Sequence, residues 1–267
     1  MYSKPRRVWA PVAPALGRDL TDARLQLHHA AQFVACLGIS YLPKADDDSH
    51  TSMEWFAGTL ASHPVGPNPF RLGIRPHPLE LVILVGDAVF ASYRLNGRTI
   101  DDGAAWIRTR VTELGLDGDG YTLTRHYTLP PHGVARGEPF DATDEQKFAE
   151  LSRWYADAAT MLQLIVDERT DASPVRCWPH HFDIATLVGI APDRTVGLGM
   201  EPGDVYYDEP YWYVTSTPPF TEAPPTIPGA GIWHTAEWTG AALPASRMAA
   251  CDAQQPQVDE FLRYFLV

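Results

Sequence analysis

The sequence is poor in cysteine and has no long apolar run, and both shortages exclude classes of protein. Its three cysteines, Cys36, Cys177 and Cys251, are far apart and form no Cys-x-x-Cys pair. That usage is typical of a reducing compartment and argues against a disulfide framework or a structural zinc site. No stretch approaches the length needed to span a bilayer, and the first residues lack the apolar centre of a signal peptide. We therefore expect a cytoplasmic protein that does not enter a membrane.

Basic residues are also scarce. The 267 residues include 21 Lys+Arg against 33 Asp+Glu, which gives a net charge of -12. Proteins that bind duplex nucleic acid or an anionic lipid surface usually carry a basic patch. The only basic group in this sequence is formed by Lys4, Arg6 and Arg7. We therefore expect neither nucleic acid nor a membrane as a partner.

Three signatures of catalysis or cofactor binding are missing as well. The chain has no Gly-x-Ser-x-Gly elbow, no His-Glu-x-x-His pair and no glycine-rich phosphate loop that opens a helix. The pair Gly197 and Gly199 is too short to form such a loop. These absences argue against a nucleotide cofactor held in the usual way, and the sequence identifies no other cofactor.

The order of the expected elements predicts an α+β fold. The 24 prolines limit long helices to the segments between them. Strand pairs joined by tight turns, such as Gly86-Asp87, favour a mainly antiparallel central sheet with flanking helices. We expect one α+β domain over 1–267, or two closely packed halves at about 1–140 and 141–267. Helices are expected at 20–38, 101–115, 142–170 and 257–265, and strands at 79–85, 88–95, 121–129, 175–188, 195–200, 211–214 and 233–235.

The first expected helix carries polar side chains among its apolar ones. Asp19 or Thr21 is suited to cap its start, and Gly38 is suited to end it. His28 and Gln32 are one turn apart and fall on the same face as the apolar residues. This face is therefore expected to contribute to a pocket.

The most informative segment is 175–188, which reads Val-Arg-Cys-Trp-Pro-His-His-Phe-Asp-Ile-Ala-Thr-Leu-Val. Its apolar content predicts a buried strand, in which successive side chains point to opposite faces. Burying polar groups costs free energy unless they are paired, so their presence indicates a pocket. Asp183 is suited to orient His181 as a general base, and these two are the catalytic candidates. One face of the strand would carry His181 and Asp183, and the other Trp178, His180 and Phe182.

Aromatic residues are dense for a chain of this size, with 8 Trp and 11 Tyr. Rings with a polar atom suit the binding of a sugar, a ring or an amine. The alternative is a large aromatic core whose hydroxyls bond to loop backbone. We expect a pocket built from the first helix, the loop at 46–51 and the strand at 178–183. The candidate ligand-binding residues are His28, Gln32, His50, Trp178, His180, Phe182, Tyr211 and Tyr213.

A metal site is a second interpretation of the histidines. Imidazole and carboxylate groups are ligands of zinc, iron and manganese. The ligands would come from dispersed segments, so we favour the simpler interpretation that these histidines hydrogen-bond to backbone and cap loops. The sequence leaves open whether a metal binds and which one. The candidate ligands are His28 or His29, His50, His126, His181, Asp183 and one of Asp46, Asp47 and Asp48.

Three motifs stand out along residues 20–220: Leu27-His28-His29-Ala30-Ala31-Gln32, then Trp178-Pro179-His180-His181-Phe182-Asp183-Ile184-Ala185, then Pro202-Gly203-Asp204 followed by Tyr211-Trp212-Tyr213. Together they resemble an uncharacterised bacterial family, a domain of unknown function with a His-x-x-x-Gln helix, a Phe-Asp-Leu-Ala strand and a later aromatic strand. The pair His180-His181 departs from the small or apolar residues of many members. The resemblance implies a shared fold and a shared pocket, and it implies no activity.

These observations predict a cytoplasmic small-molecule-binding protein or enzyme with a pocket of His, Asp and aromatic residues. For an enzyme we expect hydrolysis or lyase chemistry, with His181 as the base and His50 or His28 assisting. A metal-dependent hydrolase is one alternative. The other is a non-catalytic domain whose aromatic strand and proline-rich loop at 206–231 serve oligomerisation or the binding of a partner. The sequence does not decide between these functions, nor whether the protein forms a homo-oligomer.

Overall fold

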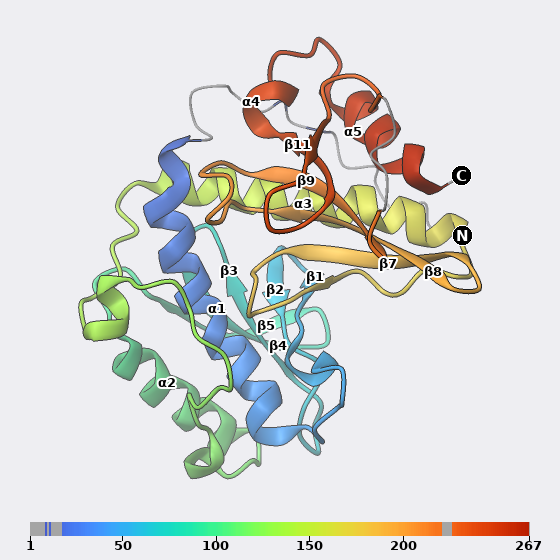
Figure 1. The fold of residues 1–267 in the computed structure, drawn as a ribbon. Coiled ribbons are helices and arrows are strands. Elements are labelled where there is room, and N and C mark those ends of the chain that lie inside the picture. The colour runs from blue at the N-terminus through green and yellow to red at the C-terminus, as the bar shows by residue number, and fades with distance from the viewer. Residues whose placement is uncertain (1–8, 10, 12–17, 221–225, 267) are drawn as a thin grey trace. The chain divides into compact units, whose positions relative to one another are not determined.

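The computed structural model describes residues 9, 11, 18–220 and 226–266 (Figure 1). The basic group at Lys4, Arg6 and Arg7 lies outside the described residues. The chain forms two compact units, and it passes between them more than once. Unit 1 consists of Met1–Asp19, Arg153–Val175 and Ile184–Val267, and unit 2 of Leu20–Ser152 and Arg176–Asp183.

Unit 2 is built on an antiparallel sheet of the order β1-β2-β3-β4-β5. The hairpin between β4 and β5 turns at Gly86-Asp87, as predicted. Helix α1 packs on β2 and β3, and α2 packs on β5. The elements are α1 (Thr21–Tyr41), β1 (Glu54–Phe56), β2 (Thr59–Ala61), β3 (Arg71–Arg75), β4 (Glu80–Val85), β5 (Ala88–Arg94), α2 (Ile100–Glu113), the start of α3 (Glu145–Glu168) and β6 (Arg176–Cys177).

Helix α1 is buried along most of its length. A helix that is covered on all sides belongs to the core, and its polar side chains must find partners there. The predicted ends of this helix were wrong. Its N-cap is Leu20, which makes no side-chain cap, and Gly38 lies inside the last turns because the helix continues to Tyr41. A Cβ at Gly38 would lie 2.0 Å from the carbonyl oxygen of His50, so the glycine permits close packing and does not end the helix.

The strand predicted at 121–129 was also wrong, because this segment is irregular. Its backbone bonds to side chains where a strand would need a ladder. The amide of Thr122 donates to Ser40 Oγ at 3.0 Å. The buried Tyr121 instead ties the segment to α1, since its hydroxyl donates to the carbonyl of Phe33 at 2.9 Å.

Unit 1 contains the second antiparallel sheet, which runs in the order β10-β11-β9-β8-β7 through this unit. Helix α4 packs on β11 and α5 packs on β9. The elements are the rest of α3, β7 (Ile184–Ala191), β8 (Arg194–Glu201), β9 (Tyr211–Thr217), β10 (Ile232–His234), β11 (Gly240–Pro244), α4 (Ala245–Met248) and α5 (Gln254–Arg263).

The structure confirms the predicted α+β class with antiparallel strands. The strands form two sheets, however, where one central sheet was expected. The described helices include none with the length and apolarity needed to cross a membrane.

Candidate functional site

The segment at 175–188 contains a tight turn where a continuous strand was predicted. Strand β6 ends at Cys177, and β7 begins at Ile184. Between them the amide of Phe182 donates to the carbonyl of Trp178, and the amide of Trp178 donates to the carbonyl of Asp183 at 2.9 Å. Phe182 has a φ of 76°, in the left-handed region that breaks the alternation of a strand.

His181 and Asp183 therefore do not share a strand face, and that prediction was wrong. His181 is exposed on the turn, while Asp183 is buried. Other residues of the turn contact polar and aromatic side chains of α1.

Two side chains of α1 hold the turn through one carbonyl oxygen. His28 Nε2 donates to the carbonyl of Pro179 at 2.8 Å, and Gln32 Nε2 donates to the same oxygen at 3.0 Å. A carbonyl oxygen has two lone pairs, so it satisfies both donors. The ring of His28 also stacks on Phe182, with centroids 4.6 Å apart and planes 3° from parallel. Three of the predicted ligand-binding residues, His28, Gln32 and Phe182, thus lie together, but they are buried and support the turn from below its surface.

The amide of Gln32 also holds a second segment. Its Oε1 accepts a hydrogen bond from the hydroxyl of Tyr127 at 2.8 Å. Burial raises the pKa of Tyr127, so this hydroxyl remains a neutral donor. One buried side chain therefore fixes both the turn that carries His180 and the loop that carries Tyr127.

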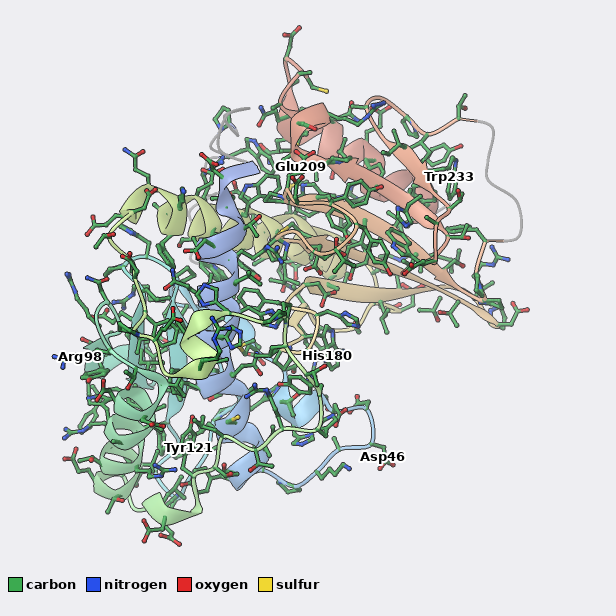
Figure 2. All side chains as sticks on the ribbon, turned by 60° about the vertical axis from the view of Figure 1, so that its left-hand side comes forward. Asp46, Arg98, Tyr121, His180, Glu209 and Trp233 are labelled. Atoms are coloured by element: carbon green, nitrogen blue, oxygen red, sulfur yellow. The ribbon has the colours of Figure 1, made fainter. Side chains whose placement is uncertain are left out.

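A partly exposed group of rings is centred on His180, which is labelled in Figure 2. The ring of His180 lies 4.5 Å from that of His181, 5.8 Å from Tyr127 and 6.1 Å from Trp178, measured between centroids. His126 meets Tyr127 edge to face at 5.2 Å, and its Nε2 lies 2.9 Å from Asp48 Oδ2. We call this group the imidazole cluster: Asp48, His126, Tyr127, Trp178, His180 and His181.

The imidazole cluster contains a histidine that is neutral at pH 7. Burial lowers the pKa of His180, and the neighbouring His181 lowers it further, while Asp48 acts in the opposite direction. A neutral imidazole offers one nitrogen donor and one nitrogen acceptor. The cluster thus combines ring faces with hydrogen-bonding groups of both kinds.

The pair of His126 and Asp48 differs from a second histidine–aspartate pair in the same unit in whether the second ring nitrogen has a partner. His132 Nε2 lies 3.0 Å from Asp22 Oδ1, but its Nδ1 accepts the amide of Val134, so both nitrogens are used. The side chain of His126 is 57% exposed, and among the described residues its Nδ1 has no hydrogen-bond partner. Asp48 therefore orients an imidazole whose second nitrogen is available. The sequence offered both residues only as metal ligands and gave no sign of their pairing.

The remaining predicted residues lie elsewhere. His50 Nδ1 accepts the amide of Ala45 at 3.3 Å, and His29 Nε2 donates to the carbonyl of Pro130 at 3.0 Å. These bonds to backbone, like that of His28, are what the favoured interpretation of the histidines predicted. No group of three or more His, Cys, Asp or Glu side chains within the described ranges is placed to hold a metal ion. Tyr211 and Tyr213 belong to unit 1.

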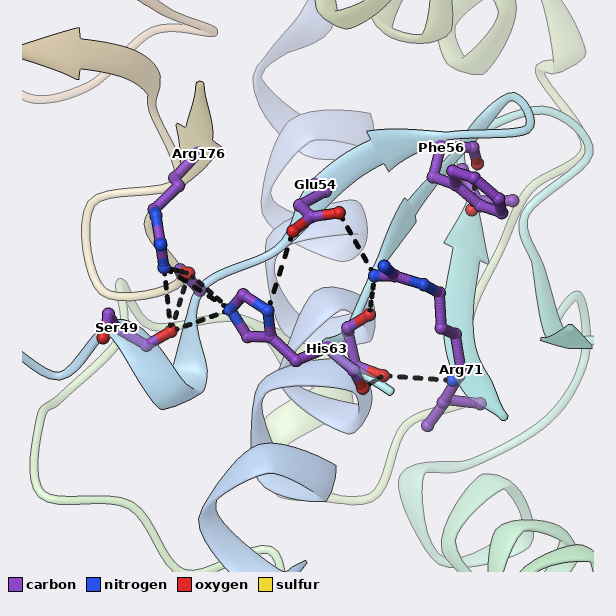
Figure 3. A network of polar contacts seen from close by, with 10 residues as sticks. Ser49, Glu54, Phe56, His63, Arg71 and Arg176 are labelled. Atoms are coloured by element: carbon purple, nitrogen blue, oxygen red, sulfur yellow. Dashed lines mark hydrogen bonds and ion pairs between the residues drawn. The ribbon is translucent and has the colours of Figure 1, made fainter. Parts of the chain in front are cut away.

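A separate polar network in unit 2 contains Ser52, His63 and Glu54, of which Figure 3 labels His63 and Glu54. Ser52 Oγ lies 3.2 Å from His63 Nε2, and His63 Nδ1 lies 3.6 Å from Glu54 Oε1. This is the order of groups in a hydrolase triad. However, Ser52 is 1% exposed, and its hydroxyl donates to the carbonyl of Ser49 at 2.7 Å. His63 Nε2 lies 3.0 Å from the same carbonyl, so the network serves to hold this loop.

We predict that this network is structural and does not act as a nucleophile. Ser52→Ala should lower the free energy of unfolding by about 1.5 kcal/mol, because it also removes the acceptor of Arg176 at 3.1 Å. Native protein should not react with a fluorophosphonate probe, since the hydroxyl is buried. Labelling of native wild-type protein that disappears in Ser52→Ala would contradict this assignment.

The chain matches no protein-family model, no curated protein and no solved structure. The resemblance to an uncharacterised bacterial family therefore stays a prediction that rests on its motifs. The imidazole cluster offers ring faces for stacking, the neutral imidazole of His180 for hydrogen bonding and the available Nδ1 of His126 as a further polar atom.

Proposed function

We propose that this protein binds a ring-containing small molecule at the imidazole cluster. The observation that carries the proposal is the single buried amide of Gln32, which bonds to both Pro179 and Tyr127. Binding sites are effective when the groups that touch the ligand are fixed in advance by a supporting layer. A surface without function does not require such support for partly exposed rings.

The chemistry of the cluster indicates how the ligand is recognised. Trp178 and Tyr127 offer faces for stacking, which suits a planar ring. His180 and His126 offer nitrogen atoms to polar groups on the ring edge. For a ligand that reacts, His126 is the residue placed to accept a proton, because Asp48 Oδ2 engages its Nε2 at 2.9 Å and orients the ring with Nδ1 available. His181, exposed on the same turn, is the second imidazole available.

The test is a titration of protein labelled with ¹³C in its histidine rings against a panel of soluble purines, pyridines and indoles. We expect at least one compound class to shift the signals of His126 and His180 together in a saturable manner. Tyr127→Phe should weaken that binding about tenfold, because it removes the hydrogen bond between the Tyr127 hydroxyl and Gln32. Loss of this bond should reduce the binding free energy by about 1.4 kcal/mol.

His132→Gln is the matched control, because it removes a histidine of the other histidine–aspartate pair. It should leave the affinity unchanged. If no compound shifts His126 and His180, or if the two variants weaken binding equally, the proposed site is wrong.

A further inference from the structure

Unit 1 carries a second group of rings, formed by two loops of its sheet. The loop between β8 and β9 contributes Tyr206 and Tyr207, and β9 begins with Tyr211. His234 ends β10, and Trp238 lies in the turn before β11. We call these five residues the unit 1 aromatic cluster. Their rings lie close together. The centroid distances are 4.6 Å for Tyr207–Tyr211, 5.6 Å for Tyr207–His234, 5.2 Å for Tyr206–His234 and 4.2 Å for His234–Trp238.

Two carboxylates are bonded to this cluster. Asp204 Oδ2 accepts the hydroxyl of Tyr211 at 2.8 Å, and its Oδ1 accepts the amides of Tyr206 and Tyr207. Glu237 Oε2 accepts the hydroxyl of Tyr206 at 3.0 Å. Among the residues that the structure describes, no Lys or Arg forms an ion pair with either carboxylate.

Both ring nitrogens of His234, the imidazole in the cluster, have hydrogen-bond partners. His234 Nε2 lies 2.7 Å from the carbonyl of Ala236, which can only accept, so Nε2 carries a proton. His234 Nδ1 lies 3.1 Å from the hydroxyl oxygen of Tyr207. The hydrogen bond to Glu237 raises the pKa of Tyr206, and burial with the charge of Asp204 raises that of Tyr207, so both phenols remain neutral.

The backbone is adapted to hold Trp238 where it lies. A Cβ at Gly240 would lie 2.4 Å from the indole, so only glycine allows the ring this position. Glu237, next to the ring, has a φ of 57°, which is an unfavourable conformation for a residue with a side chain. These features keep a tryptophan only partly buried, with a carboxylate beside it.

From this geometry we propose that the unit 1 aromatic cluster binds a small organic ammonium ion. Ring faces of Trp and Tyr attract a cation through their quadrupole, most strongly where water is partly excluded. Asp204 and Glu237 add a negative potential, and neither forms an ion pair with a Lys or Arg in the part of the chain that the structure describes. An alkylated ammonium suits these rings better than a metal ion, because its methyl groups pack on the ring faces while its charge remains diffuse. The site is separate from the imidazole cluster and does not depend on the function proposed there.

The probe is choline, followed by tryptophan fluorescence and by NMR of the aromatic ring signals at constant chloride concentration. Its neutral isostere, 3,3-dimethyl-1-butanol, has the same shape without the charge. We expect choline to bind saturably and the alcohol to bind at least about tenfold more weakly, since a cation–π site is worth about 1–2 kcal/mol. Tetramethylammonium should bind like choline if the ammonium group is what is recognised.

Two variants and a matched control complete the test. Tyr206→Leu should weaken choline binding about tenfold, and Glu237→Gln about threefold. Tyr264 is a tyrosine of the same unit with nearly the same exposure, 38% against 39% for Tyr206, so Tyr264→Leu should have no effect. Equal binding of choline and its neutral isostere would overturn the proposal, as would the absence of saturable choline binding up to about 50 mM.

Discussion

Replacing Gly38 by alanine should destabilise the protein by about 3 kcal/mol, although the same change inside most helices is stabilising by about 1 kcal/mol. The added Cβ would lie 2.0 Å from the carbonyl oxygen of His50 and 3.1 Å from its carbonyl carbon. Both atoms belong to backbone, so relief requires the whole segment Ser49–Thr51 to move away from α1. Urea unfolding should show a lower midpoint with an unchanged slope.

Gly103 in α2 is the matched control. A Cβ there would lie 2.6 Å from the tip of the Phe33 ring, which can move more easily than backbone. Gly103→Ala should therefore cost clearly less than Gly38→Ala. If Gly38→Ala is as stable as the wild type, the close packing of α1 on the His50 segment is incorrect.

Acidification from pH 7 to pH 5 should lower the free energy of unfolding by about 2 kcal/mol through His28 alone. Burial lowers the pKa of His28 to about 3 in the folded protein, although its bond to Pro179 acts the other way. In the unfolded chain the pKa is about 6.5, so the unfolded state takes up the proton first. The stabilising effect is therefore complete above about pH 6.5 and is lost progressively as the pH falls toward 3.

His28→Gln isolates this effect. Glutamine keeps a donor for the carbonyl of Pro179 but does not titrate in this range. At pH 7 the free energy of unfolding of the variant should be lower than that of the wild type by about 1 kcal/mol, because the ring stack on Phe182 is lost. Between pH 7 and pH 5 its free energy of unfolding should fall by about 2 kcal/mol less than that of the wild type. His126→Gln removes an exposed histidine as the control. An equal pH dependence in His28→Gln and the wild type would show that His28 is not the buried group responsible.

Local sequence signals were sufficient to predict much of the fold. Helices α1 and α3 and the β4–β5 hairpin were predicted because apolar periodicity and a Gly-Asp turn are properties of neighbouring residues. The turn after β6 was missed because it depends on Phe182 adopting a positive φ, which its residue type does not indicate. Its apolar flanks belong to two different elements that read together as one strand.

The candidate site was predicted only in part for a related reason. The prediction included His28, Gln32, Phe182 and His180, and these residues lie together in the structure. The sequence did not indicate that the first three are buried supports and that His180 is partly exposed. The deciding bonds link distant residues: Gln32 and Tyr127 are 95 positions apart, and Asp48 and His126 are 78 apart. No periodic pattern relates residues at such separations.

The interleaving of the two units has a consequence for the order in which the chain is made. Pro179, which satisfies His28 and Gln32, follows His28 by 151 residues. A nascent chain that emerges N-terminal end first presents α1 long before the carbonyl that its buried histidine and amide require. During that interval the two side chains must remain hydrated or find temporary partners. Unit 2 can therefore complete its folding only after residues 176–183 have been made. A fragment that ends at residue 152 would contain α1 but lack the carbonyl of Pro179.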